Sequence, residues 1–296
     1  MKEDNSPVKP AIAMLKSFTP CAHRGASGQL PGNTIEAFQR AVDIDPATLL
    51  EMDVWPTKDG HVVVFHDDDL ALSTNGEGPP TEYTLEEIRS LDAGYWFTTD
   101  KGKSFPLRGK GYRIATLREV LEGFPGVLLS IDIKYNRIDF AADVMNLLEM
   151  YDAQSRVFMG SFFPVIMGFI RKQYPDVALS YDRKELIRFL VYHKLHLVFF
   201  YKKKSDVMMI PEFSRSGFSE DLGRFFSISQ GLRVITKRFI RDAHRKGIPV
   251  IAWTINRPEN MRRLIEWGID GIVTDYPELL HEVVQYKIDA AGHDAE

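Results

Sequence analysis

The fold is decided by the short apolar stretch TLLEMDVW at residues 48–55, which lies between Pro46 and Pro56. Its residue types favour a β-strand, and a strand points residues i and i+2 to the same face. Glu51 and Asp53 therefore share one face of an otherwise hydrophobic strand. Burying two like charges is costly unless a positive group lies between them, which indicates a hard divalent cation with oxygen ligands. The alternative is that one carboxylate faces solvent beyond the strand end.

Histidines end the apolar segments on either side of this stretch. His23 ends the preceding segment, and His66 ends the following one. The later segment 127–134 places Asp132 and Lys134 on one face by the same period of two. Strand ends are where α/β barrels carry their chemistry, because the loops begin there. A single histidine is commonly structural, but these residues together predict a metal-centred site.

Length and composition fit one large domain with a single core. The chain has 296 residues, 44% of them hydrophobic, and a formal net charge of -4. This balance gives no reason to expect nucleic-acid binding, which normally shows a basic surplus. The single cysteine, Cys21, excludes an internal disulfide. The polar first residues and the lack of a long uncharged apolar run predict a cytoplasmic protein.

The order of the apolar segments predicts repeated βα units. Parallel strands connected by helices favour an α/β fold. We predict a (βα)8 TIM barrel that forms one domain over residues 1–296. An open doubly wound sheet would show the same pattern. Strands are expected near 18–24, 48–55, 62–66, 127–133, 156–161, 177–181, 207–211, 249–255 and 271–274. Helices are expected near 33–42, 84–91, 116–123, 138–151, 163–173, 183–195, 236–246, 258–267 and after Pro277.

Three segments interrupt this alternation. Residues 1–17 are predicted to be a loosely attached lead-in, and the polar segment 213–231 is predicted to be a loop. The turn at residues 58–60 predicts a hairpin that extends the second strand. The Gly- and Pro-rich segment 67–113 is an insertion after that strand, and long connections of this kind are usually functional. It is expected either to cover the site as a lid or to be a surface excursion without substrate contact.

The motifs of the chain resemble those of the glycerophosphodiester phosphodiesterases, and they occur in that family's order over almost the whole chain. The motifs are His23-Arg24-Gly25-Ala26, Pro31-Gly32-Asn33-Thr34, Glu51-x-Asp53, Asp59-Gly60 followed by His66-Asp67, Asp132-Ile133-Lys134, Trp253-Thr254-Ile255-Asn256 and Thr274-Asp275-Tyr276-Pro277. The resemblance implies a TIM barrel with an extra segment after the second strand. It also implies an enzyme that hydrolyses glycerophosphodiesters to glycerol phosphate and an alcohol.

The resemblance implies that a metal ion and two histidines perform the chemistry. Glu51, Asp53 and Asp132 would hold Mg²⁺ or Ca²⁺, which stabilises charge on the phosphoryl oxygens as a Lewis acid. His23 is assigned as the base and His66 as the acid. The attacking group is either water or a neighbouring substrate hydroxyl, the latter giving a cyclic phosphate.

Three further residues are expected to bind the substrate. Arg24 and Lys134 supply positive charge to the phosphate, and an arginine can bind it with two parallel hydrogen bonds. Trp253 either stacks on the glycerol or on an acyl chain, or is an ordinary buried barrel residue. Asp67–Asp69 are expected to be a solvated loop face rather than a second metal site, and His61 a surface residue.

Two positions depart from the family pattern. Gly32 stands where the family usually has glutamate, so one acidic group near the site is missing. Asp132 stands where the family often has glutamate. Aspartate is one methylene shorter, which predicts a longer metal bond, a water-mediated one or a different ion. The loss at Gly32 motivates a non-enzymatic alternative, a phosphodiester-binding protein without turnover.

The substrate class is open on two further points. The apolar segment 186–201 is followed by Lys202–Lys204, a pattern that suits peripheral contact with anionic lipid headgroups. Family members that act on lysophospholipids have similarly apolar sequence in this region, so the resemblance also implies a lysophospholipase D activity on lysophospholipids as an alternative. The alternative is a buried barrel helix whose C-terminus is complemented by lysines. A phospholipase D of the sphingomyelinase type shares the histidines and acids, but such enzymes are usually secreted and disulfide-bonded, which one cysteine does not fit.

Overall fold

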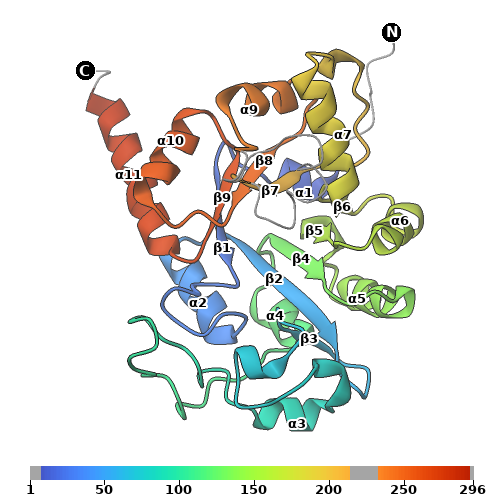
Figure 1. Ribbon diagram of the computed structural model, residues 1–296, viewed down its shortest axis with the longest axis vertical. Helices are drawn as coiled ribbons and strands as arrows, with labels where there is room; N and C mark the ends of the chain where they lie inside the picture. The colour runs from blue at the N-terminus through green and yellow to red at the C-terminus, as the bar shows by residue number, and fades with distance from the viewer. Residues whose placement is uncertain (1–7, 214–232, 294–296) are drawn as a thin grey trace, which may run out of the picture.

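The protein folds as a barrel of parallel strands surrounded by helices in the computed structural model, which describes residues 8–213 and 233–293 (Figure 1). The sheet runs in the order β6-β5-β4-β2-β1-β9-β8-β7, and a parallel bridge between Ser180 and Val207 joins its two ends. The (βα)8 prediction is therefore confirmed. The strands are β1 Thr19–His23, β2 Leu49–Pro56, β3 Val62–Val64, β4 Leu129–Ile133, β5 Val157–Gly160, β6 Ala178–Leu179, β7 Met208–Pro211, β8 Val250–Trp253 and β9 Gly271–Thr274.

The helices lie close to where the sequence predicts them. They are α1 Pro10–Ala13, α2 Ile35–Ile44, α3 Leu85–Ser90, α4 Leu117–Gly123, α5 Ile138–Met150, α6 Pro164–Gln173, α7 Arg183–Lys194, α9 Lys237–His244, α10 Pro258–Glu266 and α11 Pro277–His293. Thr34 caps α2 by accepting a hydrogen bond from the Ala37 N–H. None of the described helices is both long and apolar enough to span a bilayer. The predicted loop at 213–231 falls almost entirely outside the described residues.

The period of two in β2 divides its residues between two environments. Leu50, Met52 and Val54 are buried in the hydrophobic cluster between the sheet and its helices. Leu49 belongs instead to a second cluster, together with residues near the starts of the other strands. Because side chains alternate along a strand, Leu49 shares its face with Glu51 and Asp53. The acidic residues therefore lie on the barrel-interior face, above an apolar layer.

The start of the chain is part of this packing. Ala11 of α1 is buried in the same apolar cluster as Leu49. The Lys9 ammonium donates a hydrogen bond to the Val177 carbonyl at 2.8 Å and pairs with Asp206 at 2.9 Å. The prediction of a loosely attached lead-in is wrong for these residues, because α1 covers the apolar residues at the starts of the strands.

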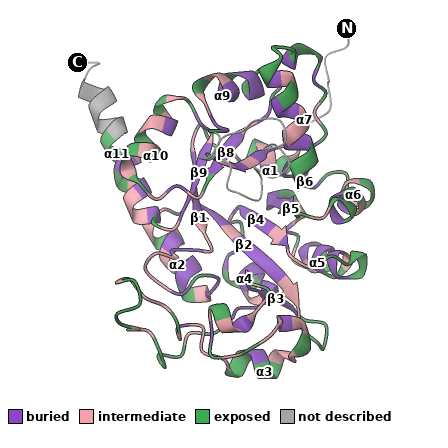
Figure 2. Ribbon diagram, viewed as in Figure 1, coloured by how far each residue is buried: buried purple, intermediate pink, exposed green. Residues whose placement is uncertain are grey.

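The insertion after the second barrel strand has a small core of its own. β3 pairs antiparallel with β2, which confirms the hairpin. Buried side chains of the insertion gather against β3, among them Leu70 and Ile88. The outer loop at residues 98–111 is largely exposed (Figure 2). This segment is thus a packed addition to the barrel, and its function as a lid stays a prediction.

Candidate active site

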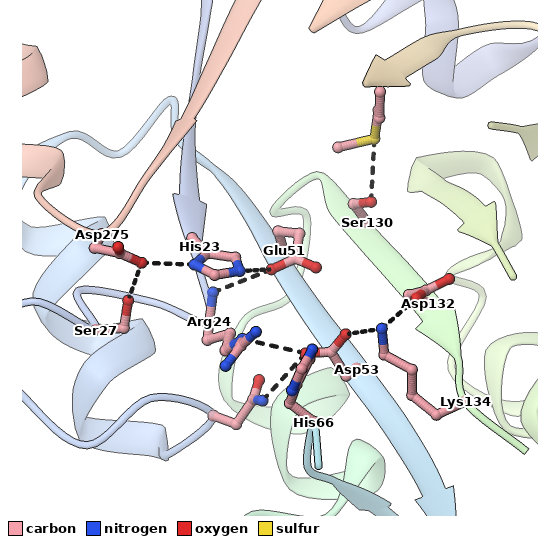
Figure 3. Close-up of polar contacts among 12 residues, drawn as sticks. His23, Arg24, Ser27, Glu51, Asp53, His66, Ser130, Asp132, Lys134 and Asp275 are labelled. Carbon is pink, nitrogen blue, oxygen red and sulfur yellow. Dashed lines mark hydrogen bonds and ion pairs between the residues drawn. The ribbon is translucent and has the colours of Figure 1, made fainter. Parts of the chain in front are cut away.

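The pairing of the strands brings the predicted site residues to one end of the barrel. His23 at the end of β1 is the Cα partner of Glu51, and Asp53 is the partner of Asp132. These residues face one another in Figure 3, with Lys134 reaching in from the residues just after β4. The carboxyl ends of parallel strands meet at one barrel mouth, where the loops supply functional groups.

Asp53 is the centre of a buried network of opposite charges. Its carboxylate contacts Lys134 Nζ at 3.0 Å and Arg24 Nε at 3.4 Å, and the residue is only 2% exposed. Lys134 Nζ also donates to Asp132 Oδ2 at 2.6 Å. The Arg24 Nε contact is an ion pair without hydrogen-bond geometry, since this atom is buried and has no hydrogen-bond partner. Arg24 is therefore held near Asp53 but keeps donor capacity for a ligand.

Two carboxyl groups of this cluster, those of Glu51 and Asp132, have raised pKa values. Burial and the neighbouring charge of Asp53 raise the pKa of Glu51 to about 7. Burial likewise raises the pKa of Asp132, although the charge of Lys134 opposes the rise. Despite its own burial, Lys134 has a raised pKa because Asp132 and Asp53 stabilise the ammonium. The raised pKa values of these two carboxyl groups therefore follow mainly from their burial away from water.

His23 is oriented by a carboxylate from the other end of the chain. Its Nδ1 lies 2.6 Å from Asp275 Oδ1, while its Nε2 lies 3.9 Å from Glu51. Asp275 is itself held by hydrogen bonds donated by Ser27 and Asn256. Burial lowers the pKa of His23, but the hydrogen bond to Asp275 and the charge of Glu51 outweigh it, and the net pKa is raised. Nδ1 is thus occupied, and Nε2 faces the acidic cluster.

His66 has a matching arrangement. Its Nδ1 lies 2.7 Å from Asp67 Oδ1, and Ser73 donates a hydrogen bond to Asp67 Oδ2 at 2.6 Å. Burial would raise the pKa of Asp67, but the hydrogen bonds from His66 and Ser73 lower it overall. Asp67 is therefore a positioning residue, and the prediction that it is merely part of a solvated loop face is wrong. Asp69 caps a short helix instead, by accepting from the Ala71 N–H.

Two tight backbone positions bring Arg24 into the site. Arg24 adopts a positive φ of 55°, and its N–H donates to the Glu51 carbonyl at 3.0 Å. Gly25 follows with φ of 82°, and a Cβ there would lie 2.5 Å from the backbone of Ala37. Gly32, where the family usually has glutamate, packs so that a Cβ would lie 3.1 Å from Arg24 Cβ. The side chains of Arg24 and Ser27 therefore crowd the position that a Cβ would occupy at residue 32.

The three predicted metal ligands are neighbours, but they do not form a ready metal site. No group of three or more His, Cys, Asp or Glu residues within the described part of the chain is arranged to hold a metal. Lys134 lies between Asp53 and Asp132, whereas Glu51 faces His23. The donor set nevertheless fits a hard cation, because every candidate ligand is an oxygen. Asn33 Oδ1 is buried without a hydrogen-bond partner, and the same amide lies beside Asp53.

The aromatic residues near the mouth include one that the sequence did not single out. Trp253 ends β8 and is 37% exposed, so the alternative of a buried barrel tryptophan is wrong, whereas contact with substrate stays a prediction. The Phe162 ring, which follows β5, lies 5.2 Å from Lys134 Nζ and is 65% exposed.

Gly160 on β5 leaves room for Asp132, since a Cβ there would lie 3.1 Å from Asp132 Oδ1.

The residues missed as functional are the ones that hold others in place. They include Asp275, Asp67 and Asn256. Asp275 and Asn256 lie in motifs at the ends of strands, which is a usable signal, and Asp67 is adjacent to His66. Their partners could not be read from the chain, because Asp275 is 252 residues away from His23.

Comparisons with known proteins agree with this geometry. Residues 23–279 match the Glycerophosphoryl diester phosphodiesterase family. A glycerophosphodiester phosphodiesterase of Caldanaerobacter subterraneus subsp. tengcongensis is 33% identical over 89% of this chain and 96% of its own length. A human lysophospholipase D is 26% identical over 88% of this chain and 84% of its own length.

A solved structure supports the same fold. An Oleispira antarctica phosphodiesterase in complex with the product sn-glycerol-3-phosphate matches with a TM-score of 0.67 and 24% identity. The match covers 93% of this chain and 99% of that one. A parallel barrel with acidic residues and histidines at the carboxyl ends of its strands defines a class of α/β-barrel proteins. This chain belongs to the glycerophosphoryl diester phosphodiesterase family, whose members are hydrolases.

Proposed function

We propose that this enzyme hydrolyses glycerophosphodiesters to glycerol phosphate and an alcohol by two-histidine acid/base catalysis with a divalent cation. The observation that carries the proposal is the pair of histidine–carboxylate contacts, His23 with Asp275 and His66 with Asp67, both close to the buried acidic cluster. A carboxylate at Nδ1 fixes the ring and its tautomer, so Nε2 is left to exchange a proton with substrate.

Each group has a defined task in this proposal. His23 accepts at Nε2 the proton of the attacking group, which is either water or a substrate hydroxyl, and His66 donates a proton to the leaving alcohol oxygen. Arg24 and Lys134 neutralise the phosphate and orient it. Mg²⁺ or Ca²⁺ held by Glu51, Asp53 and Asp132 would supply Lewis-acid stabilisation of the charge that develops on the phosphoryl oxygens.

The human relative and the apolar rim of the mouth support a second candidate activity, that of a lysophospholipase D. The exposed apolar residues that follow the carboxyl ends of the barrel strands could contact an acyl chain. They are Ile138, Phe162, Val165 and Trp253. We favour water-soluble glycerophosphodiesters as the main substrates, since the charged groups of the site match the glycerol phosphate named for the Oleispira antarctica complex.

A choline-release assay tests the proposal directly. Glycerophosphocholine and lysophosphatidylcholine are each incubated with the protein before EDTA treatment, after it, and after Mg²⁺ or Ca²⁺ is restored. We expect release from glycerophosphocholine that EDTA abolishes and metal restores, with slower release from the lysolipid. Faster release from the lysolipid would favour the second candidate. If neither substrate released choline in a metal-dependent way while the protein still bound the headgroup, the result would favour the non-enzymatic phosphodiester-binding protein.

The raised pKa of Glu51 predicts that metal affinity depends on pH. The carboxylate is the ligand form, so below its pKa of about 7 a metal must displace a proton. Affinity measured by calorimetry should fall by about tenfold per pH unit below that value and level off above it. Glu51→Gln should bind metal weakly and without this dependence. An affinity for the wild-type protein that stays flat across the range would contradict the metal role of Glu51.

A further inference from the structure

Most of α7 and the segment that joins it to β7 have a local charge unlike the rest of the chain. Residues 186–205 contain five Arg or Lys residues and no Asp or Glu, although the chain as a whole has a net charge of -4. Three of the five cations are consecutive, Lys202–Lys204. No ion pair joins these lysines to another of the described residues, and Lys202 and Lys204 are exposed. Lys202–Lys204 therefore concentrate positive charge on the surface without an acidic partner among the described residues.

The same segment exposes large apolar side chains. Leu186, Phe189 and Leu190 of α7 are buried against the barrel, as one of the two readings of the sequence predicts. After the helix the pattern changes, and four apolar side chains become exposed. They are Leu195 and Leu197, Phe199 at 63% exposed and Phe200 at 65% exposed. These four residues together with Lys202–Lys204 are called the connector surface.

The connector surface has a fixed backbone. The Lys246 ammonium donates a hydrogen bond to the Phe199 carbonyl at 2.8 Å, and Arg188 donates to the Lys202 carbonyl at 2.9 Å. The rings of Phe199 and Phe200 pack edge to face with centroids 5.4 Å apart. The aromatic pair is thus presented outward from a structured segment, and exposing it costs free energy in water unless something covers it.

The connector surface lies at the end of the barrel opposite the active site. The connector leads into the start of β7, and Asp206 at its end pairs with Lys9 beside α1. α1 packs on residues near the starts of the strands, whereas His23 and the acidic cluster lie toward their carboxyl ends. A flat partner that covers the connector surface therefore leaves the catalytic mouth pointing away from it.

We propose that the connector surface docks the protein on an anionic lipid bilayer with the catalytic mouth facing the aqueous phase. Phenylalanine and leucine side chains insert at the level of the headgroups, while neighbouring lysines attract anionic lipid. A second copy of this chain is a poorer occupant, because two positive surfaces repel each other. The orientation suits substrates that reach the mouth from water, in agreement with water-soluble glycerophosphodiesters.

Vesicle co-sedimentation tests the surface and its orientation together. The full chain is spun with phosphatidylcholine vesicles that contain or lack phosphatidylglycerol. We expect binding only to the anionic vesicles, weakened by added salt. Lys202→Glu with Lys204→Glu should lower the partition coefficient more than tenfold, since each lysine near a membrane contributes about fivefold. Phe199→Ser with Phe200→Ser should lower it to a similar degree.

A matched pair of substitutions at the mouth distinguishes the two ends of the barrel. Phe162→Ser with Val165→Ser also removes two exposed apolar side chains and should leave vesicle binding unchanged. The connector variants should hydrolyse glycerophosphocholine in solution as fast as the wild type. This result would show that the variants fold, and it would separate membrane binding from the proposed enzymatic function. Binding lost in the mouth variant but kept in the connector variants would overturn the proposal. A concentration-dependent dimer that the Phe199 and Phe200 substitutions abolish would also overturn it. The absence of binding to anionic vesicles would do the same.

Discussion

His23→Gln is expected to lower kcat/KM for glycerophosphocholine by about a thousandfold, because general acid–base catalysis contributes about 10²–10⁴ to rate. Glutamine keeps a hydrogen-bonding group near Asp275 but cannot accept and release a proton. The loss should appear mainly in kcat, since Arg24 and Lys134 still bind the phosphate. Steady-state kinetics measure this, and the thermal midpoint shows whether the fold is intact.

A surface histidine provides the control for this substitution. His61 lies on the β2–β3 turn with its side chain about half exposed and pairs only weakly with Asp59 at 3.8 Å. His61→Gln should leave kcat/KM within about twofold of the wild type.

Asp275→Asn should cause a smaller loss than His23→Gln and should shift the acidic limb of the pH–rate profile to lower pH, because Asp275 helps to raise the pKa of His23. If His23→Gln kept more than about a tenth of the activity, His23 would not be the base.

Asp53→Asn is expected to impair both catalysis and stability. The substitution keeps the shape of the side chain but removes the charge that faces Lys134 at 3.0 Å and Arg24 at 3.4 Å. We expect kcat/KM to fall about a thousandfold, because the substitution removes a proposed metal ligand and the carboxylate that holds both cations. Unfolding in denaturant should show a loss of about 3 kcal/mol, at the lower end for breaking a buried charge network because asparagine can still hydrogen-bond.

The exposed ion pair between Asp139 and Arg137 is the matched control for stability. Both of its side chains are more than half exposed, and exposed pairs contribute about 0–1 kcal/mol. Asp139→Asn should therefore change neither activity nor the free energy of unfolding appreciably. An Asp53→Asn protein as active as the wild type would show that Asp53 holds neither the metal nor the phosphate-binding cations.

Local sequence patterns predicted the barrel and the members of the site. Alternation along residues 48–55 placed Glu51 and Asp53 on one face, since side-chain direction in a strand depends only on the backbone. The capping box that Thr84 and Glu87 form before α3 is equally local, because both residues lie within one turn of the helix start. α1 was missed because it has only four residues and is stabilised by packing on the barrel, which no short window of sequence contains.

The sequence by itself determined which side chains could do chemistry and that they lie at strand ends, because residue type and period of two are properties of the chain alone. Only the tertiary structure decided their partners. Strand register set His23 beside Glu51 and Asp53 beside Asp132, and closure of the barrel brought Asp275 to His23. The position of Lys134 between two carboxylates likewise follows from packing, because the energy of a buried charge depends on every group around it.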